Sequence, residues 1–493
     1  MIELKNQIHF CDIYEEVVDC FEEDKPKFIK LFEEHINLEI LIPHSFFNAY
    51  HSSTGHPRYY SLSSMLTALI LQKILGLSET KTFLNILNLS SELRTLCRFF
   101  KVPHESQFSR FKNDFINHIH NFFNHLVHIT EPICQQLNST LSKIIIADTT
   151  GIEAYVKENN PKFFESLLRV GKSMKKKIDS NIIPHKYAYS KMPKETYANS
   201  EIKLSYINGH FCYALKATTL VNGLGIIRHI DFNDTQIMDF ENNDTAEDAK
   251  DDYDSKTLIP IMKRFFNQHK DFKYNYFLGD SAYDCDDNYK YLIKDCSIVP
   301  IICLNPRNSS NLPQPSGFTS DGTPLCPKDP ELPMKFDGIT REKGRSMRAK
   351  WLCPKSKKIK VNGKTKYNLT CTSPCTSSPC GRIYHPTINK DYRLNCPIPR
   401  DSEEWNNLYK IRTVTERTNN ILKNPLGLST LKINKSDSIK AELFIAGITQ
   451  LIALIISFTI DIKSNFCNKI FDSLVSIFLI IVVFWLSVYF LSF

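Results

Sequence analysis

The amino-acid sequence lacks the features of a secreted, disulfide-bonded protein. It does not start with a cationic segment followed by an apolar one, and its 15 cysteines are an odd number. With 493 residues it is also much longer than the small scaffolds that depend on disulfides. We therefore expect a reducing cytoplasm, and cysteines that serve another purpose.

A large excess of charge of one sign is also missing, since 61 Lys and Arg residues face 53 Asp and Glu residues. A net charge of +8 over this length does not identify a partner, so the distribution of charge matters more than its total. The apolar share of 42% is enough to build cores, which argues against wholesale disorder. The length suggests two to four folded units.

We predict four parts along the chain. Residues 1–135 are a helical N-terminal domain, residues 140–307 and 401–460 are an α/β core, residues 308–400 are a cysteine-rich basic insertion, and residues 461–493 are an apolar tail.

The N-terminal part has the apolar spacing of helices. Ser61–Leu77 carries apolar residues at steps of three and four with Ser near the start, and Val102–Phe111 opens another helix with polar and basic residues on one side. A small helical DNA-binding unit fits this pattern. A helical bundle with a solvated polar face fits it about as well.

From Lys143 the pattern changes to short apolar runs that alternate with helices. Asn222-Gly223 separates two of the runs and predicts a hairpin. The order of three strands, helix, strand, helix, strand predicts a mixed five-stranded sheet flanked by helices. The runs are Lys143–Ala147, Tyr206–Val221, Gly225–Phe232, Ser255–His269 (helix), Tyr274–Gly279, Tyr289–Lys294 (helix) and Ile298–Leu304. A polar stretch with Arg169 and Lys172–Lys177 is expected to be a loop or an excursion from the sheet.

Two aspartates share one context, since Asp148 and Asp280 each follow an apolar strand pattern directly. Strand ends lie at the rim of a sheet, where α/β folds place their chemistry. Two such carboxylates could hold Mg²⁺, which prefers oxygen ligands. For either aspartate alone, a turn or helix-capping role is the stronger interpretation.

A third acid lies on a predicted helix over Glu403–Lys423. Tyr409, Arg412, Glu416 and Lys423 would share an arc of about 60° at about 100° per residue. This stripe is too polar for a core face. The alternative is a solvated charged face with pairing between residues four apart.

The spacing Tyr-x2-Arg-x3-Glu-x6-Lys resembles the signature of bacterial insertion-sequence transposases with a DDE triad, whose catalytic domain is ribonuclease-H-like. The matching pieces are Ala147–Thr150, Gly279–Asp284 and the Tyr409–Lys423 helix, and Tyr60–Phe111 resembles the helical region of one branch of these enzymes. The likeness covers most of residues 15–460.

The resemblance implies a catalytic triad of Asp148, Asp280 and Glu416 that binds Mg²⁺ or Mn²⁺. It also implies that Tyr409, Arg412 and Lys423 contact phosphates of the transposon ends. The expected partners are double-stranded DNA, as ends and target, and a second copy of the chain when DNA is bound, in the cytoplasm beside the nucleoid. Asp284 is interpreted as the cap of the following helix rather than as a supporting acid.

Six cysteines gather between Cys326 and Cys396, with His385 among them. Cys371-x3-Cys375-x4-Cys380 resembles zinc-ligand spacing without a strict C-x2-C pair. A structural zinc ion and six free thiols are the two interpretations. The predicted zinc ligands are Cys353, Cys371, Cys375, Cys380 and Cys396.

The same insertion holds the clearest basic patch. Residues 341–366 contain eleven Lys or Arg residues and one acid, with Trp351 and Tyr367 near them, which is a DNA-binding composition. A solvated charged loop is the alternative. The predicted contacts to DNA are Arg345, Arg348, Lys350, Lys357 and Lys358.

Two uncharged stretches lie near the C-terminus. Leu443–Ile460 is interpreted as a buried core helix, because a sheet flanked by helices needs one there. Leu474–Phe493 has 20 residues and is long enough to span a bilayer. A tail anchor, a packing helix and translation past an ancestral stop remain alternatives for it.

The leading function is a transposase that cleaves insertion-sequence ends and joins them to target DNA. A metal-dependent nuclease and an inactive or membrane-tethered DNA-binding regulator derived from a transposase are the alternatives.

Overall fold

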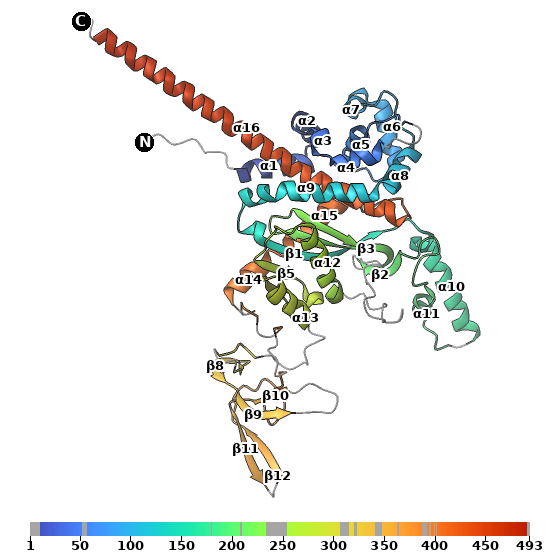
Figure 1. Cartoon of the computed structure of the whole chain (residues 1–493). Coiled ribbons are helices and arrows are strands. Elements are labelled where there is room, and N and C mark those ends of the chain that lie inside the picture. The colour runs from blue at the N-terminus through green and yellow to red at the C-terminus, as the bar shows by residue number, and fades with distance from the viewer. Residues whose placement is uncertain are drawn as a thin grey trace. The chain divides into compact units, whose positions relative to one another are not determined.

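The computed structural model describes residues 10–51, 57–178, 180–207, 210–232, 254–305, 315–319, 323–340, 348–361, 364–386, 392–393, 396–398, 400 and 402–490 (Figure 1). The chain divides into two compact units. Unit 1 is formed by residues 1–142, 149–237 and 417–493, and unit 2 by residues 143–148 and 238–416. The N-terminal helices and the last helix therefore fold in one unit.

Strand β1 (Ile144–Glu153) runs through both units. In unit 1 its second half lies beside β3 (His210–Asn222), where the amide of Ala154 donates to the carbonyl of Tyr213 at 3.1 Å. The opposite edge of β3 pairs antiparallel with β2 and β4. These two strands are Lys203–Ile207 (β2) and Ile227–Phe232 (β4).

In unit 2 the first half of β1 pairs in parallel with β5 (Tyr276–Gly279), which pairs in parallel with β6 (Val299–Ile302). The strand order is β2-β3-β1-β5-β6, with β4 also on β3, so the fold is mixed α/β. The sheet has six strands rather than the predicted five, because the run predicted over Tyr206–Val221 is divided between β2 and β3.

The strand and helix order of the core agrees with the sequence pattern in most other places. Helix α12 (Asp254–Gln268) precedes β5, and α13 (Asp286–Lys290) with a π-helical turn (Tyr291–Asp295) precedes β6. Of the two interpretations of the polar stretch around Arg169, the loop was wrong and the excursion from the sheet agrees with the structure, because the stretch is a helix, α10 (Pro161–Lys177). Asn160 caps its start by accepting from the amide of Lys162, and a proline in the first turn favours helix initiation.

Unit 1 is rich in helices. Besides α10 they are α1 (Phe10–Glu22), α2 (Lys25–His35), α3 (Leu38–Leu41), α4 (His44–Tyr50), α5 (Leu62–Ile74), α6 (Thr80–Leu89), α7 (Ser91–Leu96), α8 (Glu105–Asp114), α9 (Ile116–Leu137), α11 (Pro184–Lys191) and α16 (Ser436–Phe490), with short 3₁₀ turns at Leu141–Lys143 and Lys157–Asn159. The helices predicted over Ser61–Leu77 and Val102–Phe111 correspond to α5 and α8. Ser61 caps α5, and His104 with Gln107 forms a capping box on α8.

Helix α16 forms the centre of unit 1. It packs along α9 and also contacts α1, α5 and β4, as the adjacent ribbons in Figure 1 show. Its segment Ser436–Lys463 is long and apolar enough to cross a membrane, with a hydropathy of 2.3 in its most apolar window, yet 72% of that window is buried. The interpretation of Leu443–Ile460 as a core helix agrees with this burial. Side chains after Lys463 lie outside the described part, so the role of residues 474–493 stays a prediction.

One charged group lies inside this helical core. Glu442 of α16 is fully buried and accepts from Lys112 of α8 at 2.6 Å and from Lys73 of α5. Burial alone would raise the pKa of the Glu442 carboxyl, but the two lysines outweigh burial and lower it to about 2. A buried carboxylate thus joins the C-terminal helix to two N-terminal helices.

The insertion in unit 2 is built from hairpins rather than from loops alone, as Figure 1 shows. Its strands are β7 (Leu325–Cys326), β8 (Asp329–Pro333), β9 (Lys335–Thr340), β10 (Arg348–Leu352), β11 (Ser356–Val361), β12 (Lys364–Leu369) and β13 (Ile383–Tyr384). They pair as β7-β8, β13-β10-β9 and β11-β12.

The helix predicted over Glu403–Lys423 is two helices, α14 (Glu403–Lys410) and α15 (Thr413–Lys423). Between them the amides of Ile411 and Arg412 donate to carbonyls three residues back, so the chain makes tight turns there. The β-branched side chains of Ile411, Thr413 and Val414 lower helix propensity at this point.

Candidate active site

The register of two parallel strands brings the two predicted aspartates to one level of the sheet. Ile146 of β1 faces Leu278 of β5, so Asp148 and Asp280 stand two residues further along each chain. Asp148 lies within β1, not at its end as predicted, because the strand continues through β-branched threonines to Glu153. Asp280 follows β5 directly and accepts from the amide of Ala282 at 2.9 Å. The alternative interpretation of Asp280 as a cap is therefore confirmed. Only one of its two carboxylate oxygens accepts this hydrogen bond.

Tyr409 of α14 belongs to the same site. Its ring stacks on Trp405 with the ring centres 4.7 Å apart and the planes inclined by 12°. Burial, a hydrogen bond with the Cys303 thiol and the charge of Asp280 raise the pKa of Tyr409 to about 12, although Arg412 lowers it. Cys303 follows Ile302 of β6, which pairs with Gly279, so the tyrosine lies where β5 and β6 end.

Arg412 connects Glu416 to Asp148. Its guanidinium donates to Glu416 at 2.5 Å across one turn and lies 5.9 Å from the centre of the Tyr409 ring. Burial alone would lower the pKa of Arg412, but Tyr409, Glu416 and Asp148 raise it above its usual range. Arg412 thus interacts electrostatically with both Glu416 and Asp148. Arg412 lies between the end of α14 and the start of α15.

The three carboxylates do not form a tight cluster. Across the described residues, the only group of three or more such ligands with all ligand atoms within 4.8 Å lies elsewhere, so the triad oxygens are spaced more widely. The Glu416 side chain is 56% exposed and lies in the first turn of α15, so a change of rotamer can redirect its carboxylate. Carboxylates are the oxygen donors that suit Mg²⁺ or Mn²⁺.

Asp284 plays a structural part that the sequence did not suggest. The following helix α13 is preceded by Cys285 without a side-chain cap, so the capping interpretation was wrong. Asp284 is 2% exposed and accepts from the amide of Asn305 at 2.6 Å. It also pairs with Arg393 at 2.7 Å. It therefore ties the segment after β6 to the end of the insertion.

The remaining predicted DNA contacts fall in different surroundings. Lys423 ends α15, seven residues after Glu416, while Arg345 lies outside the described residues. Lys350 pairs with Asp337 at 2.9 Å, and Lys358 pairs with the same carboxylate, which neutralises part of the basic patch. Arg348 begins β10, and Lys357 is an exposed residue of the β11–β12 hairpin.

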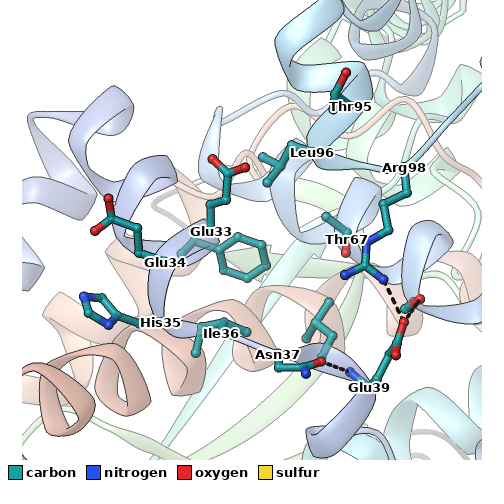
Figure 2. A pocket seen from close by; sticks show the side chains of 13 residues that line it. Glu33, Glu34, His35, Ile36, Asn37, Glu39, Thr67, Thr95, Leu96 and Arg98 are labelled. Carbon is teal, nitrogen blue, oxygen red and sulfur yellow. Dashed lines mark hydrogen bonds and ion pairs between the residues drawn. The ribbon is translucent and has the colours of Figure 1, made fainter.

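Two hollows in the N-terminal helices differ in charge. The one in Figure 2 has a volume of about 410 Å³ and is acidic, since its lining holds three glutamates, Glu33, Glu34 and Glu39, and one arginine. That arginine, Arg98, pairs with Glu39 at 2.8 Å. The other, of about 770 Å³, lies between α6 and α8. Its lining carries more positive than negative charge, together with amides and tyrosines, and includes Tyr59, Tyr60, Lys81, Asn85, Asn88, Lys101, Glu105, Gln107 and Arg110.

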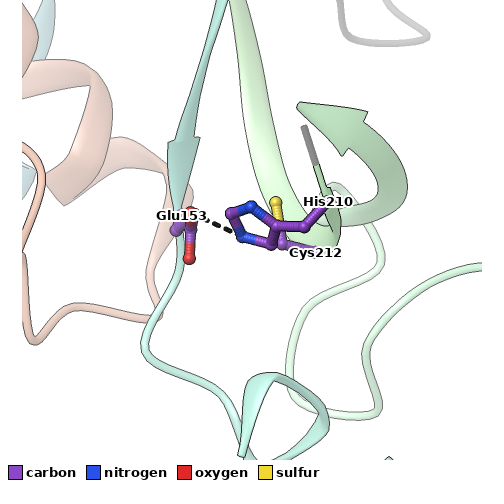
Figure 3. A group of neighbouring side chains, drawn as sticks. All are labelled: Glu153, His210 and Cys212. Atoms are coloured by element: carbon purple, nitrogen blue, oxygen red, sulfur yellow. Dashed lines mark ion pairs between the residues drawn. The ribbon is translucent and has the colours of Figure 1, made fainter. Parts of the chain in front are cut away.

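The tight group of ligand atoms is formed by Glu153, His210 and Cys212 in unit 1, shown in Figure 3. The imidazole of His210 lies 3.1 Å from the Glu153 carboxylate. Cys212 is 3% exposed, and burial with the charge of Glu153 raises the pKa of its thiol to about 11 despite Lys423. The sequence signal for this group is His210-x-Cys212 on one face of a strand, which we had not singled out.

Residues 16–114 match the family described as Transposase domain (DUF772). This stretch includes α2 to α8 and thus both hollows. A search of curated proteins finds no match to the chain. The domain match indicates a transposase, a class of enzyme that acts on DNA.

Proposed function

We propose that the chain is a DDE transposase with a ribonuclease-H-like core, which cleaves the ends of an insertion sequence and joins them to target DNA. The observation that supports this most is the shared level of Asp148 and Asp280 on adjacent parallel strands, with Arg412 linking Asp148 to Glu416. The domain match over residues 16–114 points to the same class of enzyme.

In this proposal the three carboxylates hold divalent metal. Mg²⁺ or Mn²⁺ bound there would activate the attacking oxygen and stabilise the leaving one. Water first breaks a phosphodiester bond at the transposon end and leaves a 3′-hydroxyl. That hydroxyl then attacks a target phosphate and displaces another 3′-oxygen, so one phosphodiester bond replaces another and no energy source is required.

Arg412 and Tyr409 have distinct tasks in this scheme. Arg412 now donates to Glu416. With Glu416 among the residues that would hold the metal, the guanidinium of Arg412 would be available to bind a DNA phosphate. Tyr409 is held by Trp405, so its ring supports the arginine at a fixed place. Lys423, two turns after Glu416 on α15, would contact the DNA backbone at another phosphate.

We further propose that the basic hollow between α6 and α8 binds duplex DNA. Lys81, Asn85 and Asn88 share one face of α6, and Lys101 and Arg110 extend this surface. Cations and amides are the groups that contact phosphate and base edges.

The β11–β12 hairpin with Lys357 would add a second contact to DNA. Joining two ends requires a second copy of the chain. Genomic DNA as substrate places the enzyme in the cytoplasm beside the nucleoid, with the apolar tail not needed as an anchor.

The test is cleavage and joining by the purified full chain on duplexes that carry the ends of the DNA segment encoding it. With Mg²⁺ or Mn²⁺ we expect nicked ends and joined products. Asp280→Asn is expected to lower cleavage by on the order of 10³-fold and to leave binding of the ends unchanged. Asp287→Asn removes an exposed acid seven residues away and should cleave like the unmodified chain.

Glu416→Gln, with Glu404→Gln on α14 as its matched control, tests the third acid in the same way. Cleavage by Asp280→Asn equal to that of its control, or undiminished cleavage in excess chelator, would reject the triad. Cleavage without joined products would indicate the nuclease. Binding without any cleavage in the unmodified chain would indicate the regulator.

A further inference from the structure

Four cysteines of the insertion line one hollow of about 180 Å³ in unit 2. They are Cys326, Cys353, Cys371 and Cys375, here called the four-cysteine cluster. Cys326 and Cys353 are buried, and the other two are half-buried. The sequence had suggested a different set. Cys396 instead donates to the carbonyls of Tyr392 and Arg393, and the thiol of Cys380 lies 2.8 Å from the Ser378 hydroxyl.

Strand pairing explains why distant cysteines meet. In the β11–β12 hairpin Ser356 pairs with Leu369, so Cys353 before β11 and Cys371 after β12 lie at the same end. Thr370 strengthens this end, since its amide and hydroxyl both donate to the carbonyl of Lys355. Cys326 stands in another hairpin, where it pairs with Asp329 across a two-residue turn.

Polar contacts hold these loops together around the hollow. Lys355 lies 3.5 Å from the Asp329 carboxylate, and Lys328 donates to the Ser373 hydroxyl at 3.2 Å. Gly381 allows the closest approach: it has a φ of +70°, and a Cβ there would lie 2.8 Å from the Cβ of Cys353. The backbone is thus arranged to bring a chain segment against one of the thiols.

The hollow around the thiols carries more positive than negative charge. Burial and the neighbouring cysteines raise the pKa of the Cys353 thiol, although the amide of Lys355 donates to its sulfur and opposes this shift. Three cations, Lys328, Lys355 and Arg382, line the hollow beside a single acid, Asp329. A metal with four thiolates carries a net charge of −2, which cations at this distance would balance.

The insertion has little else to stabilise it. Among its described residues, the buried apolar side chains apart from two members of the cluster are few: Met334, Leu352, Tyr384 and Ile398. Such a core is too small to offset the conformational entropy of seven short strands. Small modules of this kind commonly obtain their folding energy from a bound metal.

We propose that the four-cysteine cluster binds one Zn²⁺ that stabilises the fold of the insertion. The four sulfurs would form a closed tetrahedral site with zinc–sulfur bonds of about 2.3 Å. The sulfurs are now spaced more widely than the Glu153 group, and binding would draw them to about 3.8 Å from one another. Each thiol releases its proton to solvent as its bond to zinc forms, and no electron is transferred. This site does not depend on the catalytic proposal.

The test uses Zn²⁺ alone as the probe on the purified full chain, stripped by chelator and then reloaded. Elemental analysis is expected to give one zinc per chain. Alkylation mapped by mass spectrometry should show these four thiols, and no others, becoming protected when zinc is added. Cobalt in place of zinc should give the visible bands of tetrahedral thiolate coordination.

Variants locate the site. Cys375→Ser should weaken zinc binding by more than about 100-fold, since even changes to residues behind a ligand cost about 10–100-fold. Cys396→Ser and Cys380→Ser are matched controls within the insertion and should keep full binding. Cys212→Ser removes the one cysteine of the Glu153 group and should also keep it.

Three results would overturn the proposal. They are less than half an equivalent of zinc in the reloaded chain, protection of cysteines other than these four, and loss of zinc in Cys212→Ser or Cys396→Ser with binding retained in Cys375→Ser. The protection map needs no variant, so it decides the matter even if Cys375→Ser does not fold.

Discussion

At the scale of single residues, buried charge appears where it joins parts of the chain that are far apart in sequence. Glu442 lies 330 positions from Lys112, and the amino-acid sequence gives no sign that the two meet. In the sequence Glu442 is simply an acid before an apolar stretch. Only the packing of α16 on α5 and α8 shows its role, because pairing inside a core depends on tertiary contact rather than on local pattern.

Removing this carboxylate should be costly. Glu442→Gln leaves two buried lysines without their counter-charge, and breaking a buried pair in this way costs about 3–5 kcal/mol. Chemical unfolding of the full chain measures the loss. Glu201→Gln breaks the more exposed pair with Lys440, 3.5 Å apart, and should cost less than about 1 kcal/mol. Similar losses in the two variants would contradict the role given to Glu442.

The pH dependence of stability follows from the same group. The pKa of Glu442 is about 2 in the folded chain against an ordinary value of 4.5. Its contribution is therefore complete above about pH 4.5 and is lost as pH falls toward 2. Acid unfolding of the unmodified chain should be steeper over this window than that of Glu442→Gln. If stability fell equally with pH in the unmodified chain and in Glu442→Gln, the Glu442 carboxylate would not contribute to stability in this way.

At the scale of elements, the hydrophobic pattern predicted β5, β6 and α12, because each is a short run with clear ends. It predicted only the first half of β1, which continues past Asp148 to Glu153. It failed where local and tertiary demands differ. The stripe of Tyr409, Arg412 and Glu416 was predicted on one helix, yet the residues are divided between α14, the turn after it and α15. The dipeptide Asn208-Gly209, which falls between β2 and β3 in the sequence, was an overlooked hairpin signal. Cys326 was omitted from the predicted ligands because spacing does not reveal which hairpins pack together.

The basic hollow gives an element-scale prediction. Changing Lys101 and Arg110 together to Gln should weaken binding to duplex DNA and lower the slope of log affinity against log salt by about 0.9 for each lost phosphate contact. Fluorescence anisotropy at several salt concentrations measures this. Arg98→Gln, in the acidic hollow of Figure 2, is the control and should bind normally. An equal loss of DNA affinity in the double variant and in Arg98→Gln would mean that the loss reflects the net charge of the protein rather than this surface.

At the scale of the whole molecule, the matched transposase stretch is not a separate folding unit. Its helices share unit 1 with strands β2 to β4 and with α16, which begins more than 300 residues after the match ends at 114. The described part of α16 is a core helix despite its apolar length. Composition alone could not distinguish it from a membrane span, because both need the same residues.

Truncation tests this arrangement. A chain that ends after Lys463 keeps all the buried side chains described in α16, so it should unfold at nearly the temperature of the full chain. A chain that ends after Lys435 loses Glu442 and the whole helix, so unit 1 should not fold. Thermal unfolding followed by circular dichroism measures both. A cooperative transition in the shorter chain would show that α16 is dispensable.

The ion pair between Lys112 and Glu442 also bears on the fate of damaged gene copies. A copy with a premature stop after codon 112 and before codon 442 encodes both lysines without the acid that pairs with them. Such a product should be degraded rather than persist as a DNA-binding remnant that competes with the intact enzyme. Decay of the gene would then silence the element without producing an inhibitor of its neighbours.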